Sequence, residues 1–216
     1  MKIKACLFDL DGVIVDTAKY HFLAWKELAN ELGIDFTEEN NELLKGVSRV
    51  RSLEIILEIG KKTLTEEQKI FYTNKKNEVY LDFIYKMSDD ELLPGVKAFI
   101  AELRTQGIFV ALGSASKNAQ LILHQLKIEK LFDAVIDGNT VSKAKPDPEV
   151  FLKGAESFHV EAQNCVVFED AIAGVEAAKN AGMFCIGVGD PQTLKLADFV
   201  IPGFEGFKLK SLTDLL

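Results

Sequence analysis

The sequence predicts an α/β fold: a Rossmann-like parallel-sheet core that carries an inserted all-helical segment. Two observations lead to this fold class. From residue 93 onward, short apolar runs alternate with helical periodicity, as in strands joined by helical crossovers. Another apolar run, residues 3–8, is separated from that alternation by a long helical stretch. We therefore expect residues 1–15 and 93–216 to form the core, and residues 16–92, the helical insert, to form a second domain.

The helical insert has start signals at regular places. Thr17 can begin a helix, Thr37 and Ser48 are further N-cap candidates, and Thr65 with Gln68 matches a capping box. The helix that Thr65 opens is expected to run to about residue 86. Apolar side chains at helical spacing form the buried stripe of the first helix: Phe22, Leu23, Trp25, Leu28, Ala29 and Leu32.

The second part of the core alternates regularly between the two kinds of element. Helices are expected at 96–104, 117–126, from 148 and at 172–180, and strands at 108–113, 134–137, 165–168, 183–188 and 199–201. In open parallel sheets, ligands gather at the carboxyl ends of the strands. The residues that follow each strand are therefore the first candidates for a site.

Composition excludes several functional classes. The 216 residues carry a formal net charge of −8, which argues against nucleic-acid binding. No apolar run reaches the ~20 residues of a membrane span. Cys6, Cys165 and Cys185 lie in apolar runs, which favours reduced buried thiols. We expect a cytoplasmic protein without nucleic-acid or membrane partners, and a monomer.

Acidic residues follow two of the predicted strands, and a hydroxyl and a lysine follow others. The candidate residues are Asp9, Asp11, Ser114, Lys145, Glu169 and Asp170. Two carboxylates about 4 Å apart repel by roughly 4 kcal/mol at an effective dielectric constant of 20. A hard divalent cation removes this cost, and Mg²⁺ commonly shares its ligand shell with a phosphate. The cluster thus predicts Mg²⁺ as cofactor and a phosphorylated substrate.

The two aspartates after the first strand suit phosphoryl transfer. Asp9 can attack phosphorus and form an aspartyl phosphate, which divides one difficult displacement into two. Asp11 lies two residues on, so in an extended segment its side chain points the same way. It can protonate the leaving oxygen and later deprotonate the acceptor.

The remaining groups fit a phosphate. Ser114 and the amides around 115–118 are expected at a helix start, and Lys145 supplies a point charge. The alternatives stay open: Ser114 and the Glu169-Asp170 pair can be simple helix caps, and Lys145 a solvated loop residue. No P-loop and no dinucleotide-binding glycine motif follows a strand.

At these residues the sequence resembles the haloacid dehalogenase superfamily of phosphotransferases, whose four motifs occur in order along nearly the whole chain. They are Phe8-Asp9-Leu10-Asp11-Gly12-Val13, Gly113-Ser114-Ala115-Ser116, Lys145-Pro146 and Phe168-Glu169-Asp170. Within it, the chain resembles the β-phosphoglucomutase family in particular. That likeness adds Tyr20-His21-Phe22, Ala24-Trp25-Lys26, Leu44-Lys45-Gly46-Val47-Ser48-Arg49, Ser52-Leu53, Lys76-Asn77 and Ser116-Lys117-Asn118.

The resemblance implies interconversion of β-D-glucose 1-phosphate and glucose 6-phosphate through β-glucose 1,6-bisphosphate. Asp9 would be the nucleophile and Asp11 the general acid/base. The helical insert would be the family's cap domain, with His21 at its hinge bringing Asp11 into place. Mg²⁺ would be held by Asp9, Glu169, Asp170 and the Asp11 carbonyl. The phosphate-binding residues would be Ser114, Ala115, Lys145 and, for the distal phosphate, Arg49. The substrate-binding residues would be His21, Trp25, Gly46, Val47, Ser48, Ser52, Lys76, Ser116, Lys117 and Asn118.

Other interpretations remain. A small-molecule phosphatase of the same superfamily would share every core residue. A binding module without catalysis is disfavoured by the intact Asp9–Asp11 pair, and a dehalogenase needs neither Asp11 nor the acidic cluster. Trp25 can equally serve in packing, and His21 can be an interior histidine. Residues 50–51 have no assigned role, which leaves sugar selectivity open.

Overall fold

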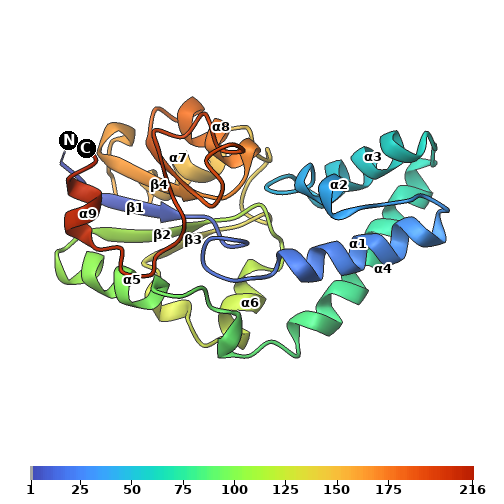
Figure 1. Ribbon diagram of the computed structural model, residues 1–216, viewed down its shortest axis with the longest axis horizontal. Helices are drawn as coiled ribbons and strands as arrows, with labels where there is room; N and C mark the ends of the chain where they lie inside the picture. Colours follow the sequence, from blue (N-terminus) through green and yellow to red (C-terminus); the bar gives the residue numbers. More distant parts are fainter. Residues whose placement is uncertain (1) are drawn as a thin grey trace.

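The core is a parallel sheet, as predicted (Figure 1). The structure, a computed structural model, describes residues 2–216. Within this range six strands pair in the order β3-β2-β1-β4-β5-β6, all parallel. Their bounds are β1 Ala5–Phe8, β2 Phe109–Gly113, β3 Ala134–Ile136, β4 Cys165–Glu169, β5 Phe184–Val188 and β6 Phe199–Ile201.

Strand β1 lies at the centre of the sheet, where the chain order reverses. It pairs with β2 on one side and β4 on the other, with Phe8 opposite both Leu112 and Phe168. All four residues of β1 are buried, as both faces of a parallel strand require. This reversal is where open α/β sheets bind ligands, so the residues after β1 occupy the expected position.

Helices cover both faces of the sheet, and the side chains of β1 alternate between them. Cys6 and Phe8 belong to one apolar cluster, with Phe99 of α5. Ala5 and Leu7 belong to the opposite cluster, with helices α7 and α8. The core helices are α5 Val96–Thr105, α6 Ala119–Gln125, α7 Glu149–Glu156, α8 Ile172–Asn180 and α9 Leu209–Thr213, with short 3₁₀ turns η1 Asp89–Glu91, η2 Glu129–Leu131 and η3 Ala162–Asn164.

The helical insert follows β1 and lies beyond the carboxyl ends of the strands (Figure 1). Its helices are α1 Ala18–Glu31, α2 Glu38–Glu42, α3 Arg49–Gly60 and α4 Glu66–Ile84. Trp25, Phe36 and Leu53 belong to an apolar cluster within the insert, whereas Tyr80 and Ile84 join the cluster of the core. The division into two domains at about residues 15 and 93 stays a prediction.

Local sequence signals identified most helix starts of the insert correctly, but the structure differs from other expectations. Thr37, Ser48 and Thr65 cap helices as expected, and the capping box of Thr65 forms. Thr17 precedes α1 but its hydroxyl donates to Asp11 instead of capping. Leu23, placed on the buried stripe, is exposed. Helix α9 was not predicted.

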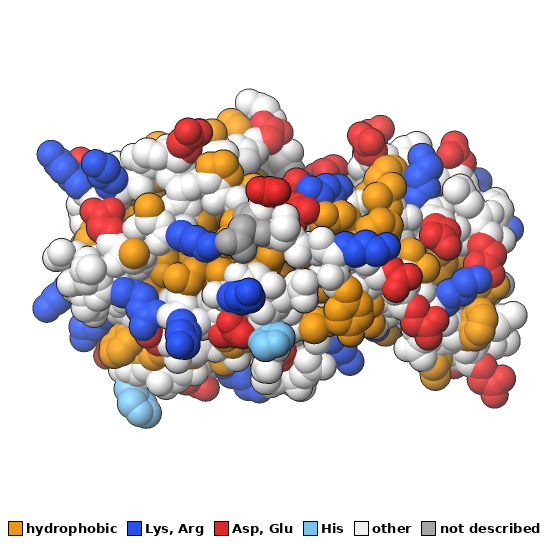
Figure 2. All heavy atoms as spheres, turned by 90° about the horizontal axis from the view of Figure 1, so that it is seen from below, with side chains coloured by type: hydrophobic (Ala, Val, Ile, Leu, Met, Phe, Trp, Pro, Cys, Tyr) orange, Lys and Arg blue, Asp and Glu red, His pale blue; other side chains and the backbone are white. Residues whose placement is uncertain are grey.

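Figure 2 shows acidic, basic and apolar side chains intermixed over one face of the molecule. Among residues 2–216, no helix is both long and apolar enough to cross a lipid bilayer. One group of opposite charges is internal: at the sheet edge beside β1, a buried lysine contacts two buried carboxylates.

Candidate active site between the sheet and the helical insert

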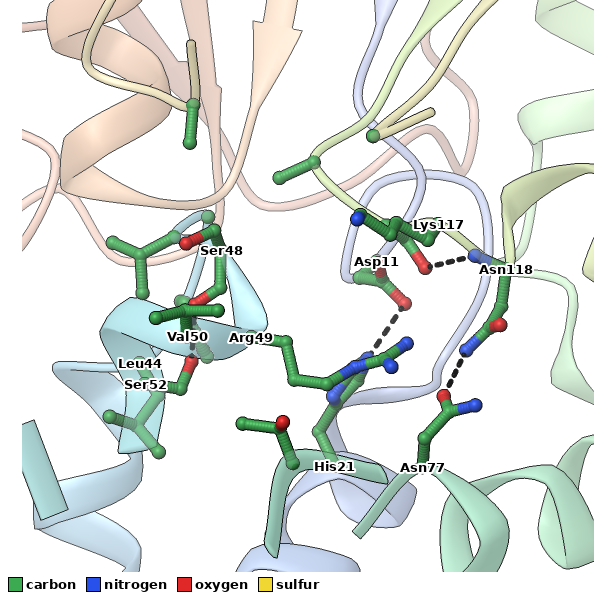
Figure 3. Close-up of a pocket in the computed structure, with 18 of the residues that line it drawn as sticks. Asp11, His21, Leu44, Ser48, Arg49, Val50, Ser52, Asn77, Lys117 and Asn118 are labelled. Atoms are coloured by element: carbon green, nitrogen blue, oxygen red, sulfur yellow. Dashed lines mark hydrogen bonds and ion pairs between the residues drawn. The ribbon is translucent and has the colours of Figure 1, made fainter. Parts of the chain in front are cut away.

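A cavity of about 540 Å³ lies between the carboxyl ends of the strands and the helical insert. This is within the usual range for small-molecule sites. Most residues predicted for the site line it: Asp9, Asp11, His21, Trp25, Gly46, Val47, Ser48, Arg49, Ser52, Lys76, Ala115, Ser116, Lys117, Asn118 and Asp170. Three others, Ser114, Lys145 and Glu169, are buried at the sheet edge and are not among the lining residues. Figure 3 shows side chains from both parts of the chain meeting across this space.

Three carboxylates converge at the sheet edge as the strand order requires. Asp9 follows β1 and Glu169 ends β4, and the pairing of Phe8 with Phe168 holds them at the same level. Asp9, Glu169 and Asp170 each place a carboxylate oxygen within 4.8 Å of the other two. Gly174 makes this possible, because a Cβ there would lie 1.8 Å from Glu169 Oε1. Such an all-oxygen donor set suits a hard divalent cation.

Lys145 compensates part of this negative charge. Its Nζ lies 2.5 Å from Asp9 Oδ1 and 2.5 Å from Glu169 Oε1, and its side chain is 1% exposed. Burial alone would lower the pKa of Lys145, but the two carboxylates raise it above its usual value. Burial raises the pKa of Asp9 to about 7, with Glu169 adding to the effect and Lys145 opposing it. Lys145 is therefore a buried charge partner and not a solvated loop residue.

The Asp11 carboxylate has a separate environment. The Thr17 hydroxyl donates to Asp11 Oδ1, and His21 Nε2 lies 3.6 Å from the same oxygen (Figure 3). On its other side His21 Nδ1 lies 2.9 Å from Lys76 Nζ, within hydrogen-bond distance. A charged Lys76 can only donate in this bond, and that direction places the His21 proton on Nε2, toward Asp11. Burial would raise the pKa of Asp11, but His21 and Thr17 lower it below its usual value.

Arg49 lies at the start of α3, and its side chain extends across the cavity toward the side from which His21 and Asn77 enter (Figure 3). Partial burial lowers the pKa of its guanidinium. Among the described residues no carboxylate forms an ion pair with it. On the opposite wall, the side-chain amide of Asn118 donates to Asn77 Oδ1 of α4 at 2.9 Å, and this hydrogen bond joins core and insert. The cavity is therefore lined by a cationic side chain, Arg49, that comes from the insert and is separate from the acidic cluster of the core.

The turn 114–118 differs in detail from the expected anion site. The Ser116 amide donates to Ser114 Oγ at 3.0 Å, and the Asn118 amide donates to Ser116 Oγ at 3.2 Å. These two amides are therefore satisfied within the turn. Helix α6 begins only at Ala119, two residues later than predicted. Ser114 is fully buried, and its Oγ already accepts a hydrogen bond from the Ser116 amide. The hydroxyl proton is what this side chain still has to donate.

Sequence reasoning assigned no role to several residues that take part in the site. Lys45 Nζ lies 3.8 Å from Asp170 Oδ2, linking the insert to the acidic cluster. Thr17 was noted only as a helix cap, and Asn77 only as part of a motif. Tyr80 of α4 lines the cavity and packs against His21, with ring centroids 4.2 Å apart. Lys45 and Asn77 lie next to predicted residues, which is the one signal that could have found them.

Comparisons with known proteins agree with this geometry. A sequence model of the haloacid dehalogenase-like hydrolases matches residues 3–182. The chain is 45% identical to a β-phosphoglucomutase of Bacillus subtilis, over 98% of this chain and 95% of that protein. It is 32% identical to a phosphorylated-carbohydrates phosphatase of Thermotoga maritima, over 84% and 82% of the two chains.

A solved structure extends the likeness to the fold. The β-phosphoglucomutase of Clostridium difficile superposes with a TM-score of 0.94 at 40% identity, covering 99% of this chain and 96% of that one. The predicted resemblance is confirmed by the family match and by the β-phosphoglucomutases of Bacillus subtilis and Clostridium difficile. The chain belongs to the haloacid dehalogenase-like hydrolase family and, within it, is similar to β-phosphoglucomutases.

Proposed function

We propose that this protein is a Mg²⁺-dependent β-phosphoglucomutase that interconverts β-D-glucose 1-phosphate and glucose 6-phosphate. One observation carries the proposal: groups of three kinds meet at a single cavity. They are the acidic cluster with its buried partner Lys145, the guanidinium of Arg49, which forms no ion pair among the described residues, and the Asp11 carboxylate, which contacts neither. A sugar bisphosphate has the matching charge pattern, with one phosphate for each cationic region. The likeness to two β-phosphoglucomutases supports the choice of sugar.

The acidic cluster fits Mg²⁺ by its chemistry. Asp9, Glu169 and Asp170 offer carboxylate oxygens close together. Burial, with repulsion from the neighbouring carboxylates as a smaller cause, raises the pKa of both Asp9 and Asp170, so the cluster is costly as anions without a cation. These three side chains, with the Asp11 carbonyl, would hold the ion. When bound, the ion would neutralise charge on the transferring phosphoryl group and on the nucleophile.

The residues of the chain can perform two matched transfers. In the first, an Asp9 oxygen forms a bond to one phosphorus of the bisphosphate while the bond from that phosphorus to the sugar oxygen breaks, leaving a sugar monophosphate. Asp11, in its protonated form, gives its proton to that departing oxygen. In the second transfer the free hydroxyl of β-D-glucose 1-phosphate loses its proton to Asp11 and attacks the aspartyl phosphate, which regenerates Asp9 and the bisphosphate. Lys145 stays beside Asp9 throughout and offsets charge on the phosphoryl oxygens.

The helical insert supplies the selectivity against water. His21, Lys76 and Arg49 all come from the insert, whereas Asp9 and Lys145 come from the core. Binding of the distal phosphate to Arg49 would hold the insert against the core and so keep His21 beside Asp11. Water lacks that second phosphate, so it gains no such help.

The experiment is ³¹P NMR of the protein with β-glucose 1-phosphate, Mg²⁺ and a trace of bisphosphate. The proposal expects glucose 6-phosphate to appear without free phosphate. Arg49→Ala should lower mutase turnover by about a hundredfold or more, because a charged hydrogen-bond partner in a desolvated site is lost. Arg51→Ala is the matched control, since Arg51 is on the same helix but pairs with Glu54 and Glu58 at the surface. Unchanged turnover in Arg49→Ala would contradict the proposal.

A sugar-phosphate phosphatase is the second candidate, favoured by the phosphatase of Thermotoga maritima at 32% identity. The same spectra distinguish the two functions, because a phosphatase accumulates inorganic phosphate. The three cysteines are buried and free, which supports the further proposal that the protein works in the cytoplasm. The monomeric state stays a prediction.

A further inference from the structure

Lys76 is a buried ammonium group without a carboxylate partner. The residue is 3% exposed, and within residues 2–216 its one hydrogen bond goes to His21 Nδ1. Isolated burial of a charge costs several kcal/mol unless something compensates it. Burial lowers the pKa of Lys76 well below its usual value, Arg49 adds to that effect, and Asp11 opposes it. Another source of negative potential is needed around Nζ.

Two aromatic rings occupy that position. Lys76 Nζ lies 4.4 Å from the ring centroid of Tyr80 and 4.8 Å from that of Trp25. Both rings are almost completely buried, at 1% and 2% exposure. The face of an aromatic ring carries negative potential, and its attraction for a cation is largest where water is excluded.

Tyr80 presents its ring, and not its hydroxyl, to Lys76. This buried hydroxyl has no hydrogen-bond partner among the described residues. An unpaired buried hydroxyl is a cost, so its removal is neutral or favourable. The Tyr80 ring also packs against His21, with centroids 4.2 Å apart, and so contacts both members of the Lys76–His21 pair.

We propose that Trp25 and Tyr80 are positioning residues, whose ring faces form a cradle that holds the Lys76 ammonium charged and directed at His21 Nδ1. A carboxylate would hold the charge equally well, but it would compete with His21 for the ammonium protons. Ring faces stabilise the cation without accepting a proton from it. The cradle thus leaves a Lys76 proton for Nδ1, and the His21 proton stays on Nε2, toward Asp11.

The importance of the cradle for catalysis rests on the proposed mutase function, whereas its effect on stability does not. Trp25 is the only tryptophan in the chain, so fluorinated tryptophans can be incorporated at this one position. Fluorine withdraws negative potential from the ring face with little change of shape. We expect kcat for the mutase to fall stepwise with the number of fluorines, by about tenfold for the fully fluorinated ring.

The control reaction is phosphorylation of Asp9 by acetyl phosphate, followed by ³¹P NMR. Its leaving group is a carboxylate that needs no proton, so this reaction does not need Asp11, His21 or Lys76. Its rate should be unchanged across the fluorinated series. A fall of equal size in both reactions would mean that fluorination damages the site generally, and would overturn the proposal.

The stability arm is a double-mutant cycle in urea. Fluorination should lower the unfolding midpoint in the parent protein and leave it unchanged in Lys76→Met, because the neutral side chain gains nothing from the ring face. Equal shifts in both backgrounds would overturn the cradle whether or not the protein is a mutase. If the cycle shows coupling but no mutase turnover exists, the proposed function alone fails.

Tyr80 provides an independent check with a matched pair. Tyr80→Phe keeps the ring and removes the unpaired hydroxyl, so kcat should remain within about twofold of the parent. Tyr80→Leu keeps apolar volume but removes the ring face, and kcat should fall by about tenfold or more. A Tyr80→Phe variant as impaired as Tyr80→Leu would contradict the assignment to the ring.

Discussion

Replacing Lys145 by alanine should destabilise the metal-free protein by about 3–5 kcal/mol, the usual cost of removing one partner from a buried ion pair. The structure places this change at the upper end of mutational effects, because Nζ contacts both Asp9 and Glu169 at 2.5 Å and the side chain is 1% exposed. Without Lys145, both carboxylates stay buried and each is less stable as an anion. The pKa of Asp9 in the folded state, which burial already raises to about 7, should rise further above that of the unfolded chain.

The sign of the pH dependence follows from the raised pKa of Asp9. The folded variant then binds more protons than the unfolded chain from about pH 4 to above pH 7, so its stability must fall as pH rises through that window. Mg²⁺ should restore part of the loss, since it binds only the folded cluster. The assay is urea unfolding at pH 5 and pH 7, with EDTA or with Mg²⁺.

Lys143 provides the matched control for this experiment. It lies two residues away with a side chain that is 71% exposed, and it forms a surface pair with Asp147. Lys143→Ala should change the free energy of unfolding by less than about 1 kcal/mol at either pH. If Lys145→Ala in EDTA is as stable as Lys143→Ala, the buried-charge argument for the site is wrong.

Two further predictions concern the same edge of the sheet. Gly174→Ala places a methyl group 1.8 Å from the present position of Glu169 Oε1, so Mg²⁺ affinity by isothermal titration should fall by about tenfold or more while the helix itself is favoured. Hydrogen bonds from Lys153 and from the amides of residues 142–143 lower the pKa of Glu149 to about 2. This loop should therefore stay ordered down to about pH 4 and loosen only as pH falls toward 2; Glu149→Gln should loosen it at neutral pH, measured as faster amide exchange.

The acidic edge could be predicted because it depends on strand order and residue type alone. A parallel sheet brings the carboxyl ends of β1 and β4 together whatever the details of packing, so Asp9 and Glu169 had to meet. The same argument holds for the alternation of helix and strand that positioned the core. Such repeating patterns still predict the right order of strands and helices when the predicted ends of an element are slightly wrong.

Contacts that join the two parts of the chain could not be predicted from periodicity. Whether Thr17 caps α1 or donates to Asp11 depends on how the linker turns, and both uses satisfy the same hydroxyl. The Asn77–Asn118 hydrogen bond joins residues 41 positions apart, one within α4 and the other at the start of α6. Only the position of the helical insert on the core decides these pairings.

The division of labour between the two parts has a chemical reason. Asp9 is surrounded by groups of the core, so it can receive and keep a phosphoryl group wherever the insert stands. Asp11 is held by Thr17 and by His21, which belong to the linker and to α1, so its readiness to move a proton depends on the insert. Attack by an alcohol on the aspartyl phosphate needs a base, and attack by water needs the same base. In the proposed mechanism that base depends on the insert, which the distal phosphate would engage through Arg49, so the base would be denied to water while the site stands open.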